Sequence, residues 1–197
     1  MEEIKRKIIE EFNHGVSRSF NMSSIHEWAE TPTSKIIFSH KFLDYCKANT
    51  CGNYNKSWTC PPACKSLEEQ KNIILTYDKL FVFTTKHNLE DSFDYDGMTK
   101  GQNLHTLITA QLKEKLPETL VYGAGKCPVC STCSFPSPCP FPEKMIGSIE
   151  AAGIDVTELS KAAGINYNNG PDTVTFFSVI FCQKQIRLED LDLPNAV

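Results

Sequence analysis

Thr173-Val174-Thr175-Phe176-Phe177-Ser178-Val179-Ile180-Phe181-Cys182 contains the longest apolar run of the chain and is rich in β-branched and aromatic residues. The turn sequence Asn168-Asn169-Gly170-Pro171 precedes it, so residues 173–182 are predicted to form a strand. Residues 80–85 (LFVFTT) have the same character and the length of a second buried strand. We therefore expect the core of the protein to form around these two strands.

Three helices are predicted from their periodicity and their end signals. Ser66 followed by Glu69 forms a capping box at the start of one helix. A second begins at Asp155, with Glu158 as its capping partner, and ends at Gly164. The third spans about 101–116 and ends before Pro117. Its apolar residues recur on one helical face: Leu104, Leu107, Ile108, Leu112 and Leu116.

Weaker patterns complete the secondary structure. We expect helices at 2–13 and 143–152, and short strands at 36–38 and 120–122. The resulting order predicts an α+β fold, a mixed α/β layer of about four strands, with two cysteine-rich loop insertions. A chain of 197 residues is long enough to bury one core without staples, so residues 1–197 are expected to form a single domain.

Composition excludes several classes of protein. Apolar residues make up 41% of the chain and charged residues 22%, which is typical of globular domains. A net charge of -4 leaves no broad basic face, so we do not expect nucleic acid as a partner. The sequence shows neither a signal peptide nor an apolar run of the roughly 20 residues that a membrane helix needs. We therefore expect a soluble, cytoplasmic protein without membrane contact, in which clustered cysteines are metal ligands or redox centres rather than disulfides.

Four of the nine cysteines lie in the segment 127–142. Cys127, Cys130, Cys133 and Cys139 have the spacing C-x2-C-x2-C-x5-C-P. The bacterial ferredoxin spacing, C-x2-C-x2-C-x3-C-P, differs only before the last cysteine, so this ferredoxin-like region predicts a 4Fe-4S cluster. The pattern leaves open whether Cys139 ligates this cluster or a neighbouring one. Zinc is the alternative metal, although its usual ligands are two separated C-x2-C pairs.

Another four cysteines lie between residues 46 and 64. Cys46, Cys51, Cys60 and Cys64 have the spacing C-x4-C-x8-C-x3-C, which matches no common ligand pattern closely. Cys64 lies just before the helix predicted from Ser66, whose positive N-terminal end favours an anionic thiolate site. We therefore expect a second iron-sulfur cluster here, with zinc or no metal as the alternatives.

Three further residues are candidates for contact with a bound cofactor. Trp58, two positions before Cys60, is expected to cover the first cluster and exclude water from it. Gly125 would let the backbone approach the second region closely, and Lys126 could offset cluster charge. Cys182 ends an apolar strand and is interpreted as a core residue. No dinucleotide-binding, phosphate-binding or nucleophile-elbow motif is present, so no catalytic residue is assigned and enzymatic activity is left open.

Three segments together resemble a known protein family. These are residues 51–62 (CGNYNKSWTCPP), the run from Gly125 through Cys139, and residues 148–156 (SIEAAGIDV). They are similar to the prokaryotic predicted metal-binding proteins grouped as domain-of-unknown-function family 2284, and the resemblance covers about 40–182. It implies metal binding through the two cysteine regions in an intracellular prokaryotic protein, and it supplies no substrate or reaction. The family usually has an arginine after the last cysteine of the second region, where this chain has Pro140.

Three functions are compatible with these residues. The first is an iron-sulfur protein with one or two 4Fe-4S clusters that exchanges electrons with a redox partner protein. The second is a zinc-stabilised binding module without redox chemistry. The third is an enzyme whose cluster has an open iron site that acts as a Lewis acid. The ferredoxin-like spacing favours the first.

Overall fold

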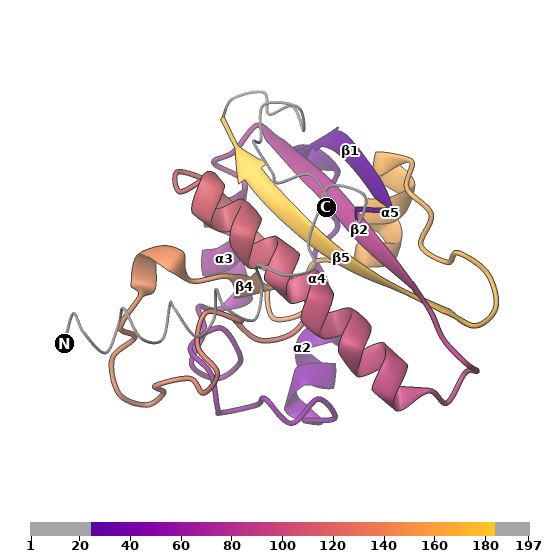
Figure 1. The fold of residues 1–197 in the computed structure, drawn as a ribbon. Helices are drawn as coiled ribbons and strands as arrows, with labels where there is room; N and C mark the ends of the chain where they lie inside the picture. Colours follow the sequence, from indigo (N-terminus) through magenta and orange to yellow (C-terminus); the bar gives the residue numbers. More distant parts are fainter. Residues whose placement is uncertain (1–24, 184–197) are drawn as a thin grey trace.

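The computed structural model of the chain describes residues 25–183, which form a five-stranded sheet between layers of helix (Figure 1). The strand order is β1-β2-β5-β3-β4. At its centre, β5 (Thr173–Cys182) has the bounds predicted from the sequence. It pairs antiparallel along its whole length with β2 (Lys79–Asn88), which extends the expected strand at both ends.

Shorter strands flank this central pair. On one side, β1 (Glu27–Pro32) pairs antiparallel with β2. On the other side, β3 (Leu120–Gly123) pairs antiparallel with β5, and β4 (Gly147–Ser148) pairs parallel with β3. The sheet thus has five strands where about four were expected, because β1 and β4 carry no strong sequence pattern.

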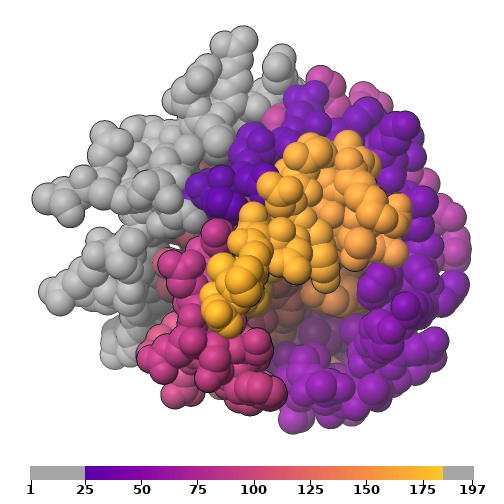
Figure 2. All heavy atoms as spheres, turned by 90° about the vertical axis from the view of Figure 1, so that its right-hand side faces the viewer, coloured from indigo at the N-terminus to yellow at the C-terminus, as the bar shows by residue number. Residues whose placement is uncertain are grey.

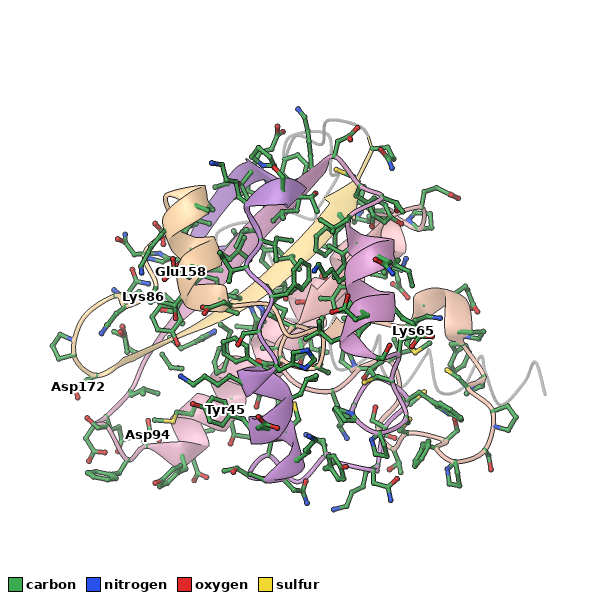
Figure 3. The ribbon with its side chains drawn as sticks, turned by 180° about the vertical axis from the view of Figure 1, so that it is seen from behind. Tyr45, Lys65, Lys86, Asp94, Glu158 and Asp172 are labelled. Carbon is green, nitrogen blue, oxygen red and sulfur yellow. The ribbon has the colours of Figure 1, made fainter. Side chains whose placement is uncertain are left out.

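Helices cover both faces of the sheet. α4 (Tyr95–Lys115) lies across one face, whereas α3 (Leu67–Ile74) and α5 (Val156–Ala163) lie on the other, which Figure 3 shows from behind. Side chains of β2 alternate between the two cores. Leu80 and Val82 pack in the core below α3 and α5, and Phe81 and Phe83 pack in the core below α4. This alternation confirms the mixed α+β fold.

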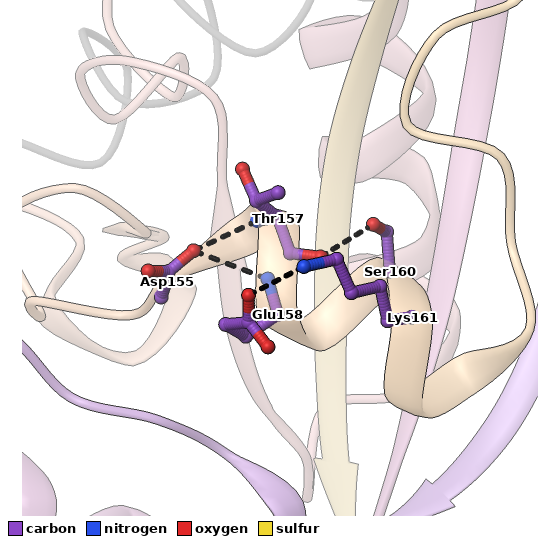
Figure 4. A network of polar contacts seen from close by, with 5 residues as sticks. All are labelled: Asp155, Thr157, Glu158, Ser160 and Lys161. Carbon is purple, nitrogen blue, oxygen red and sulfur yellow. Dashed lines mark hydrogen bonds and ion pairs between the residues drawn. The ribbon is translucent and has the colours of Figure 1, made fainter.

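Caps fix the ends of the two short helices. Ser66 and Glu69 form the predicted capping box at the start of α3. Asp155 begins α5, where its carboxylate accepts hydrogen bonds from the backbone N–H groups of Thr157 and Glu158 at 3.0 and 3.1 Å (Figure 4). α5 ends at Gly164, whose φ of 69° is the left-handed conformation expected after a helix.

Two of the weaker predictions are wrong. Residues 36–38 form no strand; Phe38 makes an isolated bridge to Ile154, and the edge position belongs to β1. Residues 143–152 form no helix, because a 3-10 turn (Pro142–Lys144) is followed directly by β4. A Cβ at Gly147 would lie 2.3 Å from the Tyr122 ring, so glycine lets β4 pair closely with β3. The expected helix at 2–13 lies outside the described residues.

Within residues 25–183, none of the helices combines the length and apolar character that crossing a bilayer requires. The cysteine-bearing segments leave the sheet layer at the same end. One follows α2 (Lys41–Lys47) and reaches α3, and the other connects β3 to β4.

Candidate metal centres

The eight cysteines of the two segments form two groups of four. Those we call the first group are Cys46, Cys51, Cys60 and Cys64, and those we call the second group are Cys127, Cys130, Cys133 and Cys139. Members of each group lie close enough for their thiolates to repel one another. Each loop thus brings its own four cysteines near one another.

Burial and mutual repulsion disfavour thiolates in the first group. Burial is the main cause that raises the pKa of Cys46 to about 11, and the Glu150 charge and two neighbouring thiolates add to it. The pKa of Cys60 rises to about 12, mainly through burial and then through its three neighbours. Cys51 is the exposed member of this group. A bound metal cation would relieve this repulsion, because metal ligation requires deprotonated sulfur.

Gln70, at the start of α3, lies beside Cys64. The Cys64 sulfur lies 4.0 Å from the side-chain nitrogen of Gln70, which is buried in the first turns of the helix. The same Gln70 nitrogen donates to the carbonyl oxygens of Lys65 and Ala151 at 2.8 and 2.9 Å. Gln70 therefore ties the first loop to the turn after β4. The sequence singled out the helix end but not Gln70, since a polar residue inside a helix is ordinarily exposed.

All four cysteines of the second group line one small cavity of about 20 Å³. Its walls include Trp58, Phe141 and Met145, so the sulfurs face apolar side chains. Ser134 also lines it, and its buried hydroxyl has no hydrogen-bond partner among the described residues. A buried hydroxyl without a partner is costly, and an acceptor atom bound between the sulfurs would satisfy it.

Backbone N–H groups point at two sulfurs of the second group. Burial raises the pKa of Cys127, although the Ile146 N–H, 3.5 Å from its sulfur, acts in the opposite direction. At Cys133 burial acts to raise the pKa of the thiol. Hydrogen bonds from the backbone of Phe135 and Trp58 act in the opposite direction, and the pKa lies below its ordinary value. Donors of this kind stabilise thiolate and tune metal-sulfur centres.

Trp58 lies against the second loop. Its indole N–H donates to the Ser137 carbonyl oxygen at 2.9 Å, and its ring meets that of Phe135 edge-on at 5.0 Å between centroids. We expected Trp58 to cover the first group, and these contacts show that this interpretation is wrong. Residues 57–59 belong to the first loop in sequence but pack against the second loop. Thr59 adds to this packing by accepting a hydrogen bond from the Cys127 N–H at 3.0 Å.

Gly125 and Lys126 lie where the two loops meet. Both line a cavity that also contacts Cys46, Cys51 and Cys60. Gly125 has a φ of 84°, and a Cβ there would lie 3.0 Å from the side-chain nitrogen of Gln102 on α4. Lys126 is exposed, and its charge contributes to lowering the pKa of Cys133. Gly125 thus faces the first group, whereas Lys126 lies between the two groups.

Neither group is closed around a single ion. Among residues 25–183, no three His, Cys, Asp or Glu side chains converge as the ligands of one metal ion. A tetrahedral zinc site would hold its sulfurs about 3.8 Å apart. Cys182 belongs to neither group and is buried in the core below α4, as expected.

Comparison with known proteins places the chain in a family predicted to bind metal. A family model described as "Predicted metal-binding protein (DUF2284)" matches residues 29–182, which include both cysteine groups. The chain belongs to this family. The DUF2284 match begins within β1 and ends with β5, so it covers the sheet except for the first two residues of β1. No curated protein and no solved structure matches the chain.

Proposed function

We propose that each cysteine group binds a 4Fe-4S cluster and that the protein exchanges electrons with a redox partner protein. The observation that carries this proposal is the grouping: eight of the nine cysteines fall into two sets of four, of which the second set lines one cavity and three members of the first line another. Four thiolates are the ligand set of such clusters. When bound, a 4Fe-4S cluster supplies a one-electron redox centre.

The surroundings of the second group support a cluster with sulfur acceptors. Ser134 has a hydroxyl without a partner among residues 25–183 and lies beside the four cysteines, and backbone N–H groups are directed at Cys127 and Cys133. Trp58 and Phe141 line the same cavity, and their apolar rings would limit the access of water to a cluster there. Hydrogen bonds to sulfur and low solvent access are the features through which a protein sets the potential of an iron-sulfur centre.

A second candidate function is an enzyme in which the first group holds its metal with three thiolates. Cys51 favours it, since this cysteine is exposed and lines a cavity that could admit a substrate. An iron without a fourth protein ligand would then be open to act as a Lewis acid.

Cysteine variants purified without oxygen test both functions. Cys60→Ala and Cys130→Ala should each lower the iron content from about eight to about four per chain. Cys182→Ala is the matched control and should leave it unchanged. If neither variant loses iron, the assignment of one cluster to each group is contradicted. If Cys51→Ala keeps about eight irons, the open-site enzyme becomes the better account of the first group. Zinc in place of iron would identify a zinc-stabilised module.

A further inference from the structure

A cavity of about 480 Å³ opens beside the first cysteine group. Cys46, Cys51 and Cys60 form part of its wall, and the rest comes from α2, the first loop, α4, the segment after β3, β4 and the turn that follows it, and β5. Figure 2 looks onto this recess between the purple first loop, the magenta α4 and the yellow β5. Its volume falls in the range of small-molecule binding sites. The cysteines form only part of the wall, so a metal centre does not account for the rest of the cavity.

Aromatic rings line much of this cavity. They are Phe42, Tyr45, Tyr54 and Phe176. Phe42 and Tyr45 meet edge-on with 6.3 Å between their centroids, and both come from α2. The face of an aromatic ring carries negative potential and attracts cations. The Lys41 ammonium already lies 5.7 Å from the centroid of Tyr45, whose exposed side chain is at the rim.

The cavity is lined by one acidic side chain, Glu150, and one basic side chain, Lys126, of which Glu150 would attract a positive ligand. One oxygen of the Glu150 carboxylate accepts a hydrogen bond from Ser148 at 2.7 Å. An ionised carboxylate has about four acceptor sites, so Glu150 retains capacity for a ligand. Thiolates that ligate a metal at the first group would add negative charge. Lys126 is the opposing charge, but it is exposed and shared with a neighbouring cavity that contacts Cys130.

We propose that this cavity binds a small organic cation, an alkylated amine or a quaternary ammonium compound. Its apolar substituents would lie against the aromatic rings, with its positive charge near Glu150. Aromatic rings together with a carboxylate are the groups that recognise such ligands, because a quaternary nitrogen offers no hydrogen to donate. The inference goes beyond the proposed function, since it holds whichever metal the cysteines bind.

Choline and its uncharged isostere 3,3-dimethylbutan-1-ol are suitable probes. They have nearly the same shape and differ in charge at one atom. We would titrate each into the metal-loaded full-length protein and measure binding by ligand-observed NMR. Choline should bind at least about tenfold more tightly than the alcohol. Equal affinities, or no choline binding at concentrations up to about 50 mM, a range that covers even weak small ligands, would overturn the proposal.

Variants locate the binding site. Glu150→Gln keeps an acceptor for Ser148 and removes the charge, so choline binding should weaken about tenfold while alcohol binding stays the same. Phe42→Leu should weaken choline binding in the same selective way. Glu143→Gln, an exposed carboxylate outside the cavity, is the control. Unchanged choline binding in Glu150→Gln would overturn the assignment. Metal content would be measured on the same samples. A loss of choline binding with unchanged metal content then concerns the cavity alone and not the proposed metal centres.

Discussion

Thr59 and Cys127 join the two cysteine loops through a hydrogen bond of 3.0 Å from the Cys127 backbone N–H to the Thr59 hydroxyl. The residues are 68 positions apart in sequence, and Thr59 is buried. Trp58 continues the connection with its bond to the Ser137 carbonyl. The second loop is therefore built partly on residues of the first, and we expect the two metal centres to depend on each other.

Thr59→Val tests this dependence. Valine has nearly the same shape but no hydroxyl, so the Cys127 N–H would lose its partner. The free energy of unfolding should fall by about 1–3 kcal/mol, and metal should be lost first from the second group. Urea denaturation and metal analysis would measure both effects. Thr99→Val, which removes an exposed hydroxyl bonded within α4, is the control. Equal behaviour of the two variants would show that the loops are independent.

Ser134→Ala tests the interpretation of the unpartnered hydroxyl. If this hydroxyl donates to a sulfur of a bound cluster, its removal destabilises the more negative reduced state. The reduction potential of the second centre should then become more negative, by an amount on the order of tens of millivolts. Spectroelectrochemical titration would measure the shift. Ser131→Ala, an exposed serine in the same loop, should leave the potential unchanged. A potential unaffected by Ser134→Ala would mean that Ser134 makes no such bond.

A buried chain of hydrogen bonds runs between β2, α4 and β5. The Thr109 hydroxyl donates its hydrogen to the His105 carbonyl oxygen, so it must accept the hydrogen of the Ser178 hydroxyl. The Ser178 oxygen in turn accepts a hydrogen bond from His105 Nε2. His105 Nδ1 then accepts from the Thr85 hydroxyl at 3.0 Å. The bonds fix the Nε2–H tautomer of a neutral imidazole. Burial is the main cause that lowers the pKa of His105 to about 3.

His105 should therefore make stability depend on pH. In the unfolded state the histidine has a pKa near 6.5 and is protonated below that pH, whereas in the folded state it stays neutral down to about pH 3. Between these two values only the unfolded state binds the proton, which favours unfolding. Stability is complete above pH 6.5 and falls as the pH decreases through this window. The loss should reach a few kcal/mol at its lower end. Burial lowers the pKa of His87 as well, which acts in the same direction.

His105→Gln separates this contribution from acid loss of metal. Urea midpoints of wild type and variant, both demetallated, would be compared between about pH 7 and about pH 5. The wild-type midpoint should fall more steeply with decreasing pH. Parallel curves would exclude His105 as the source of the dependence.

Asp155→Ala should destabilise the protein by about 1 kcal/mol, because two N–H groups at the start of α5 lose their acceptor. Thermal unfolding would measure the change. Lys161→Ala removes an exposed ion pair with Glu158 on the same helix and should change stability little. A smaller effect for Asp155→Ala than for Lys161→Ala would contradict the role of the cap.

The sequence predicted those parts of the fold that local patterns specify. β5 and β2 follow from continuous β-branched and aromatic runs, and the ends of α3 and α5 follow from their caps. β1 and β4 escaped prediction because an edge strand is held by its partner rather than by its own residues. Gly147 illustrates this, because it can pair with β3 only since it has no Cβ that would collide with the Tyr122 ring.

The site was predictable in composition but not in arrangement. Spacing placed four cysteines in each loop; the four of the second group line one cavity, and three of the first group line another. Trp58 was assigned to the loop that contains it, yet its contacts are with the other loop. Gln70 and Ser134 escaped prediction for the same reason: their roles depend on residues brought near them by folding.

Metal analysis tests most directly whether the two cysteine groups hold redox-active iron-sulfur clusters. Iron, acid-labile sulfide and zinc would be measured on protein purified without oxygen, with absorption spectra before and after dithionite. Two clusters predict about eight irons and about eight sulfides per chain, with a broad brown absorbance that bleaches on reduction. A colourless protein with about one or two zinc ions per chain and no sulfide would contradict the claim.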